Sequence, residues 1–210
     1  MMPRKNLTYD NHYLGLPILP EPEHGNYLPI LDAIHRGMER MVDRHCRVFG
    51  VILGLSLPWE TGCVPHNGHM QTFFDAFSRC LKGRGIDYHY VWVREQPAAD
   101  AQPHFHCLVL FDGNKTWSFY GQHLDTASRL WAETLGLERG DGLVHLCTWD
   151  EAMDPNIPYV GNGGVMIQRN SPDCDQAYQL LFARSAYLGK AITKEFTPRD
   201  VRKFSTSHMT

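Results

Sequence analysis

The sequence predicts an α+β fold, in which helices pack against an antiparallel sheet. Three observations support this: helical and strand-like patterns alternate along the chain, two strand-like runs follow each other directly, and helical patterns bracket that pair. Adjacent strands joined by a short loop form an antiparallel hairpin, and the flanking helices bury their apolar faces against the sheet. The chain of 210 residues is long enough for one domain of this kind.

Residues 1–27 contain several prolines and show no sustained periodicity, so we expect an irregular N-terminal arm. Residues 28–210 should form a single domain, because no repeat or low-complexity tract divides them. Its first helix should end near Arg44. Apolar residues at helical spacing mark this helix: Ile30, Leu31, Ile34, Met38, Met41 and Val42.

Apolar runs, and the prolines and glycines that end them, predict the next elements. RVFGVILGLSLP predicts a buried strand that Pro58 ends. Apolar residues at helical spacing between residues 70 and 81 predict a second helix, closed by the glycines of KGRG. DYHYVWVREQ and PHFHCLVLF then predict two strands, and the loop QPAADAQP between them fits a hairpin.

The rest of the chain completes the pattern. A third helix is predicted from Leu124 to Leu135, before Gly136, and GLVHLCTW and GGVMIQRN predict two more strands. A final helix is predicted over residues 173–193, before a polar basic tail. The predicted elements follow in the order helix, strand, helix, strand, strand, helix, strand, strand, helix. This order favours a ferredoxin-like or RRM-like sheet.

Composition excludes several classes of protein. The six cysteines form no CxxC pair, which argues against a disulfide scaffold or a zinc ribbon. The N-terminus lacks the apolar core of a signal peptide, and no run approaches the roughly 20 apolar residues of a membrane span. We therefore expect a soluble, cytoplasmic protein without a membrane partner.

Positive charge gathers at the C-terminal end, although the net charge is −3. From Arg184 onward six basic residues face two acidic ones, so this segment carries +4 and the remainder −7. Such a local field can attract a polyanion, but a solvated basic tail is an equally good interpretation. Arg184, Lys194, Arg202 and Lys203 are the candidates for DNA contacts.

Two histidines stand at the start of the strand PHFHCLVLF. His104 and His106 point to the same face, about 6.6 Å apart along the strand, and could bind one metal ion. If Glu95 lies opposite His104 across the hairpin, then Val93 lies opposite His106, and all four share that face. One carboxylate and two imidazoles with open positions suit Mg²⁺ or Mn²⁺ better than zinc. The alternative is a pair of partly buried histidines bonded to backbone carbonyls.

The final predicted helix carries a second candidate group. Tyr187, Lys190 and Lys194 are spaced i, i+3 and i+7, which places them on one helical stripe at the border between core and solvent. A nearby ammonium group favours the phenolate form of tyrosine, whose ordinary pKa is about 10. Lys190 could equally hold a phosphate oxygen, and Tyr187 could be an ordinary interfacial tyrosine.

Taken in order, Glu95, His104-Phe105-His106 and Tyr187-Leu188-Gly189-Lys190 resemble the three signatures of HUH single-strand DNA endonucleases of the replication-initiator (Rep) type. The blocks ILDAIHRGMERMVDRHCRVFGVILGLSLP, YVWVREQ…PHFHCLVL, GLVH and SAYLGKAITK…VRKFSTS resemble the YagK/YfjJ and inovirus replication-initiator group. This resemblance covers residues 27–207, most of the chain.

The resemblance implies an HUH endonuclease palm and site-specific nicking and joining of single-stranded DNA through a 5′-phosphotyrosine. It implies that His104, His106 and Glu95 bind the metal, that Tyr187 is the nucleophile and that Lys190 assists it. Such an enzyme initiates rolling-circle-type replication of a phage, plasmid or integrated mobile element at an origin, which can be a hairpin. A host polymerase would extend the released 3′-OH, and a host helicase would be needed because the chain has no GxxxxGKS loop.

Ile52, Gly54 and Ser56 depart from this pattern, because relatives often carry charged residues on the first strand. Any DNA contact from that strand is therefore in doubt. Two other functions stay open: a DNA-binding protein of the same fold that has lost catalysis, and a metal-dependent phosphoester hydrolase that uses activated water.

For three further groups of residues we prefer a structural role to a functional one. Tyr88, Tyr90 and Trp92 could stack on bases, but the hairpin register turns them away from the metal, which favours core packing. Cys107 should also lie on the opposite face from the histidines. One short-spaced group could bind zinc but lacks a second compact ligand pair. Its members are Cys63, His66, His69 and Cys80.

Overall fold

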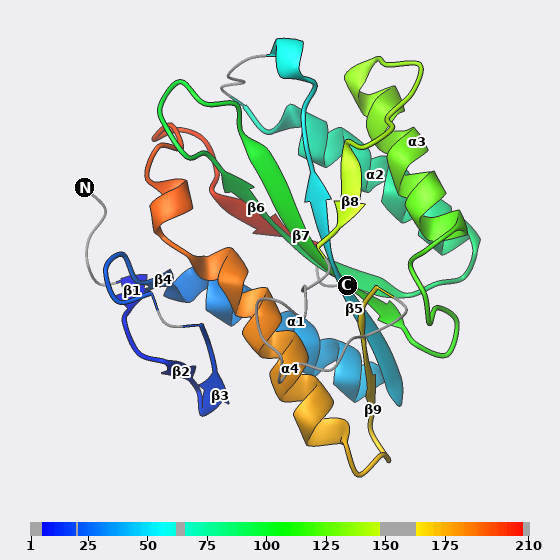
Figure 1. The fold of residues 1–210 in the computed structure, drawn as a ribbon. Helices are drawn as coiled ribbons and strands as arrows, with labels where there is room; N and C mark the ends of the chain where they lie inside the picture. The colour runs from blue at the N-terminus through cyan, green and yellow to red at the C-terminus, as the bar shows by residue number, and fades with distance from the viewer. Residues whose placement is uncertain (1–5, 20, 62–65, 148–162, 208–210) are drawn as a thin grey trace.

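A six-stranded antiparallel sheet forms the centre of the computed structural model, which describes residues 6–19, 21–61, 66–147 and 163–207 (Figure 1). The strand order is β10-β6-β7-β5-β8, and β9 pairs with the same edge of β5 as β8 does. The strands are β5 (Arg47–Leu55), β6 (Tyr88–Glu95), β7 (His104–Asp112), β8 (Val144–Leu146), β9 (Val165–Gln168) and β10 (Phe204–Thr206). The α+β class predicted from the sequence is confirmed.

Helices cover both faces of this sheet. The four α-helices of the described ranges are α1 (Leu28–Arg44), α2 (Gly68–Gly83), α3 (Gln122–Leu135) and α4 (Cys174–Ala186). α1 and α4 pack on one face, and α2 and α3 on the other (Figure 1). From α1 to α4 the elements follow the predicted order. Within the described ranges, no helix is both long and apolar enough to cross a bilayer.

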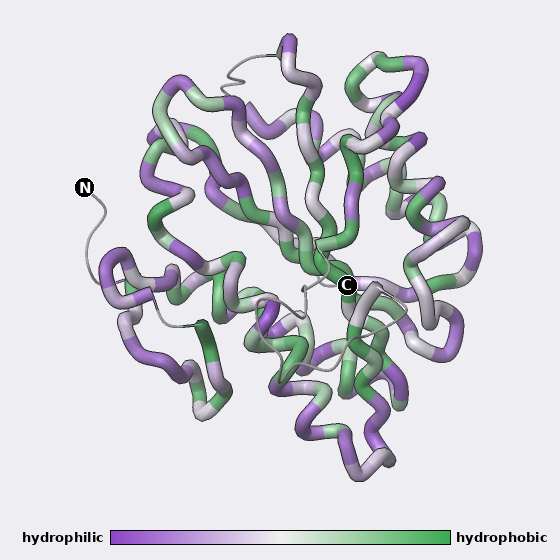
Figure 2. The backbone as a smooth tube through the Cα atoms, viewed as in Figure 1, coloured by the Kyte–Doolittle hydropathy of each residue, from purple (hydrophilic) through white to green (hydrophobic). Residues whose placement is uncertain are grey.

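The face under α2 and α3 holds an aromatic core. Phe73 contacts Trp131 edge to face at a centroid distance of 5.5 Å, and Phe74 stacks on Tyr90 at 3.7 Å. Tyr88 and Trp92 belong to the same cluster, so the aromatic row of β6 packs in the core, as we preferred. Figure 2 shows the apolar colour along the central strands of the sheet.

The N-terminal arm is more ordered than the sequence predicts. In its described part, β1 (Leu7–Thr8) pairs with β4 (Asn26–Tyr27), and β2 (His12–Tyr13) pairs with β3 (Leu16–Pro17). The Tyr13 ring stacks on Phe182 of α4 at a centroid distance of 6.2 Å. The arm therefore packs against the helical layer that α1 and α4 form.

The final helix is shorter than predicted. α4 ends at Ala186, and the chain continues as two 3₁₀ turns, η3 (Tyr187–Gly189) and η4 (Ile192–Lys194). Between them, Lys190 forms a β-bridge with Asn26 of the arm. The prediction of a helix to residue 193 was wrong because these backbone contacts with the arm replace helical hydrogen bonds.

The basic tail was also mispredicted. Residues Phe204–Thr206 form β10, which pairs with β6 and completes one edge of the sheet. The Arg94 amide donates to the Lys203 carbonyl at 2.8 Å and extends this pairing. The C-terminal segment is thus part of the fold rather than a solvated extension.

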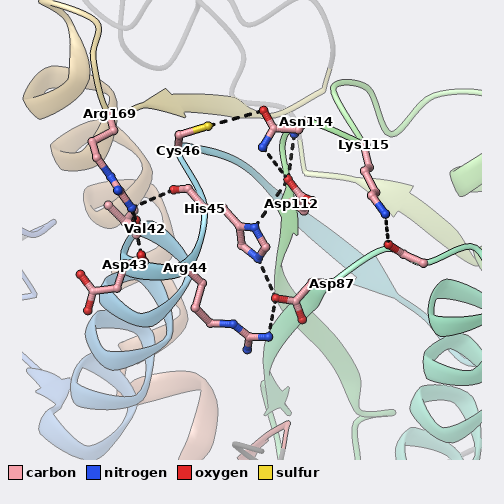
Figure 3. Close-up of polar contacts among 11 residues, drawn as sticks. Val42, Asp43, Arg44, His45, Cys46, Asp87, Asp112, Asn114, Lys115 and Arg169 are labelled. Carbon is pink, nitrogen blue, oxygen red and sulfur yellow. Dashed lines mark hydrogen bonds and ion pairs between the residues drawn. The ribbon is translucent and has the colours of Figure 1, made fainter.

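A polar junction ties the opposite end of the sheet to α1 (Figure 3). His45, which caps α1, lies 2.6 Å from the Asp87 carboxylate through Nε2 and 3.7 Å from Asp112 through Nδ1. Arg44 also pairs with Asp87, at 2.9 Å. The junction joins the C-terminus of α1 to the start of β6 and the end of β7, and leaves the other ends of these strands to the candidate site.

Candidate metal centre and tyrosine site

The β6–β7 hairpin brings three metal-ligating side chains together. Glu95 pairs with His104 and Val93 with His106, which is the register assumed from the sequence. One ligand atom from each of Glu95, His104 and His106 lies within 4.8 Å of the others. Glu95 Oε2 is 3.5 Å from His104 Nε2, and the two imidazole centroids are 5.2 Å apart. In the described ranges these residues form one compact group on the α1/α4 face of the sheet.

The protonation states suit a divalent cation. Burial raises the pKa of Glu95, but the hydrogen bond with His104 and the charge of Lys194 outweigh it and hold the value at about 2. Burial lowers the pKa of His106 to about 4, although the Glu95 charge opposes this shift. At pH 7 the group therefore offers a carboxylate and a neutral imidazole, the forms that bind metal. The donor set fits a divalent ion.

Cys147 contacts the second histidine from beyond the end of β8. Its Sγ lies 3.6 Å from His106 Nδ1. Burial and the Glu95 charge raise the pKa of Cys147 to about 11, so the thiol stays neutral. When Nδ1–H donates to the sulfur, Nε2 keeps its lone pair for a metal. We did not predict a role for Cys147 from the sequence.

Lys194, a candidate DNA contact, is fully buried beside Glu95. Its Nζ donates to Glu95 Oε1 at 3.1 Å, to the Lys190 carbonyl at 3.0 Å and to Thr193 Oγ1 at 3.2 Å. These three acceptors use all three ammonium hydrogens. Lys194 is therefore not available at the surface, and it holds one carboxylate oxygen while the other faces His104.

Tyr187 lies on η3 and is half-buried. Lys190 Nζ sits 4.2 Å from the centre of its ring and 2.9 Å from Glu21 Oε1 of the arm. Burial lowers the pKa of Lys190, but its hydrogen bonds with Glu21 and Tyr187 outweigh this and raise the pKa, so the ammonium is charged. The predicted helical stripe does not exist, yet Tyr187 and Lys190 are in contact.

The remaining basic candidates differ in exposure. Arg184 is buried and donates to the Cys147 carbonyl at 3.4 Å, so it is not a surface contact for DNA. Arg202 is exposed. Lys203 is half-buried, and its Nζ donates to the Lys194 carbonyl. Most of these basic residues thus pack around the candidate site and do not line an open groove.

The zinc alternative gains no support. Cys63 lies outside the described residues, and the rings of His66 and His69 are 5.2 Å apart. The part of the chain that the structure describes contains one group of three or more potential metal ligands, and it is the hairpin group. Cys107 is buried in the core on the opposite face, as predicted.

Comparison with known proteins gives one match. The family model of the YagK/YfjJ C-terminal domain matches residues 10–207, which include the whole sheet, the hairpin group and Tyr187. No curated protein and no solved structure matches the chain.

Proposed function

The chain belongs to the YagK/YfjJ C-terminal domain family, and from this premise we propose that it is a metal-dependent enzyme that nicks and rejoins single-stranded DNA. The observation that carries the proposal is the Glu95–His104–His106 group on the β6–β7 hairpin. The segment with Tyr187 and Lys190 connects to this group, because the Lys190 carbonyl and Glu95 accept hydrogen bonds from the same ammonium of Lys194.

The topology supports the HUH-type assignment. The segment from β5 to β8 runs strand, helix, strand, strand, helix, strand, and its strands lie in the order β6-β7-β5-β8. Both helices of this segment, α2 and α3, cover one face. Such an arrangement is typical of ferredoxin-like domains. The metal ligands project from the opposite face, on which α1 and α4 pack.

Glu95, His104 and His106 would hold a divalent cation, Mg²⁺ or Mn²⁺, which when bound supplies Lewis-acid polarisation of a phosphate oxygen. The protein prepares this position in two ways. Lys194 fixes the carboxylate through Oε1, and Cys147 contacts His106 through Nδ1. Both contacts restrict the ligands before the ion arrives.

Tyr187 would attack the phosphorus atom of a scissile phosphodiester. The bond from phosphorus to the tyrosine oxygen forms as the bond to the 3′-oxygen breaks, which leaves a 5′-phosphotyrosine and a free 3′-OH. The phenol loses one proton and the departing oxygen takes up one, so the step is balanced. The Lys190 ammonium lies beside the ring, 4.2 Å from its centre, and would contact the reacting phosphate.

The covalent link makes the cleavage reversible and leaves a 3′-OH that can be extended. Because the phosphotyrosine retains an ester bond, a 3′-OH can attack it and rejoin the strand. The free 3′-OH can also prime a polymerase, which fits initiation of rolling-circle-type replication on a mobile element. Host helicase and polymerase are the partners this function requires.

A denaturing gel tests the proposal. The protein is incubated with Mn²⁺ and a pool of short single-stranded oligonucleotides, and a protein–DNA adduct that survives denaturation is expected. The adduct should vanish in Tyr187→Phe and with EDTA. Tyr178→Phe is the matched control, because the Tyr178 hydroxyl donates to Glu39 at 2.6 Å, away from the hairpin group. Cleaved DNA without an adduct would indicate a hydrolase, and a mobility shift without cleavage would indicate a binding protein; either result overturns the proposal.

A further inference from the structure

A third histidine lies in the same cross-strand row as His106. On β5, Gly54 pairs with His106 of β7 on one side and with His145 of β8 on the other. Residues paired across neighbouring strands project from the same face of a sheet. His145 therefore lies on the face that carries the Glu95–His104–His106 group.

Gly54 leaves room for the imidazole of His145. A Cβ added at Gly54 would lie 2.2 Å from His145 Cε1 and 2.3 Å from Nε2. The φ angle of Gly54 is not positive, so the backbone conformation does not require glycine there. What the position requires is space, because the ring of His145 leans across β5 toward His106.

The distance between the two strands is compatible with a shared ion. β8 and β7 lie two strand spacings apart, about 10 Å, so two imidazoles that reach toward each other over Gly54 can meet at one metal. The His145 nitrogens are not among the ligand atoms that lie within 4.8 Å of one another, so the ring would turn toward Glu95, His104 and His106 when the ion binds. The His145 ring lies over Gly54, between the two strands.

We propose that His145 is a fourth protein ligand of the metal held by Glu95, His104 and His106, and that Gly54 is present to admit it. This inference rests on the metal site of the proposed function. Three imidazoles and one carboxylate favour Mn²⁺, Co²⁺ or Zn²⁺ over Mg²⁺, because imidazole suits transition metals whereas Mg²⁺ prefers oxygen. His145 thus makes the centre a transition-metal site.

Metal binding without DNA tests the inference. Mn²⁺ and Mg²⁺ affinities are measured by calorimetry, and Co²⁺ absorption spectra report coordination, for the full chain and for His145→Ala, Gly54→Ala and the double variant. His145→Ala should weaken Mn²⁺ binding at least about 10-fold, change the Co²⁺ spectrum and leave Mg²⁺ affinity nearly unchanged. Gly54→Ala should have the same effect, since its methyl group displaces the ring. The double variant should bind no more weakly than His145→Ala.

Controls separate the possible failures. His12→Ala removes an exposed histidine of the arm and should change nothing. Melting curves in EDTA should match for the full chain and His145→Ala, which excludes misfolding. If the full chain binds Mn²⁺ and His145→Ala binds it equally well, the inference is overturned while the proposed function stands. If Glu95→Gln and His104→Ala also leave Mn²⁺ binding unchanged, the metal site of the proposed function fails.

Discussion

The buried pair of Lys194 and Glu95 gives the sharpest prediction about stability. Lys194→Met keeps the length of the side chain but removes its charge, and leaves the Glu95 carboxylate buried without its counter-ion. At the observed 3.1 Å the attraction between the two charges is about 5 kcal/mol for an effective dielectric constant of about 20. Removal of one partner of a buried pair typically costs about 3–5 kcal/mol. We expect Lys194→Met to lower the free energy of unfolding by that amount.

Urea denaturation at pH 7 in EDTA measures this loss. Lys82→Met, an exposed position on α2, is the control and should stay within about 0.5 kcal/mol of the parent chain. The double variant Glu95→Gln/Lys194→Met should be more stable than the sum of the single changes predicts, by about 3 kcal/mol, because neither charge is then left alone.

Mn²⁺ supplies a second readout. Added ion should stabilise Lys194→Met more than the parent chain, since it compensates the carboxylate that lost its partner. The reasoning is refuted if Lys194→Met loses less than about 1 kcal/mol, or if the two substitutions add within about 0.5 kcal/mol. Either result would mean that water or a neighbouring group already neutralises Glu95.

Three further predictions concern stability away from the site. Burial lowers the pKa of His89 to about 4, below the unfolded value of 6.5, so its contribution is complete above pH 6.5 and is lost as the pH falls toward 4. Up to about 3 kcal/mol should disappear over this window in urea titrations, and His89→Gln should flatten the loss. Asp87→Asn weakens the 2.6 Å contact with His45 and should cost about 1–3 kcal/mol in the same assay. Trp131→Phe removes the 2.7 Å hydrogen bond from the indole to the Ser56 carbonyl and part of a buried ring, and should lower the unfolding free energy by about 1–3 kcal/mol.

Each of these three has a contrary outcome. A pH profile identical in His89→Gln and the parent chain would mean that another group controls acid stability. Asp87→Asn without measurable loss would show that Asp112 alone holds the capping histidine of α1. A Trp131→Phe variant as stable as the parent would mean that the core under α2 and α3 relaxes around the smaller ring.

The hairpin group was predictable because local rules determine it. Strand alternation puts His104 and His106 on one face, and a short loop between adjacent strands leaves few registers, one of which sets Glu95 opposite His104. The first three helices were predictable for a similar reason, since the apolar periodicity of each marks its buried face. For α1 the marked residues Ile34, Met38 and Met41 are indeed buried.

The contacts that complete the site depend on tertiary structure. The stretch after Ala186 has a helix-compatible sequence, and only the bridge from Lys190 to Asn26 of the arm shows why the helix stops. This turn carries Lys194 inward to Glu95, so a residue predicted for DNA contact became a buried partner. No pattern within residues 174–194 could reveal that, because Asn26 lies 164 residues before Lys190.

His145 was missed for a related reason. Its place beside His106 depends on two registers, β5 with β7 and β5 with β8, and on the missing side chain of Gly54. We noted Gly54 in the sequence only as a departure from the group that the chain resembles, and its meaning appears only when the strands lie side by side. β10 was missed because a three-residue edge strand carries too short a pattern to distinguish it from a loop.

Mass spectrometry of the protein–DNA adduct shows directly whether Tyr187 is the nucleophile. After incubation with Mn²⁺ and the oligonucleotide pool, nuclease and protease digestion should leave a peptide with a 5′-nucleotide phosphate on the Tyr187 oxygen. We expect this modified peptide in the parent chain and in Tyr178→Phe, and we expect it to be absent from Tyr187→Phe and from samples treated with EDTA. A nucleotide attached to any other residue, or cleaved DNA with unmodified Tyr187 throughout the time course, would contradict it.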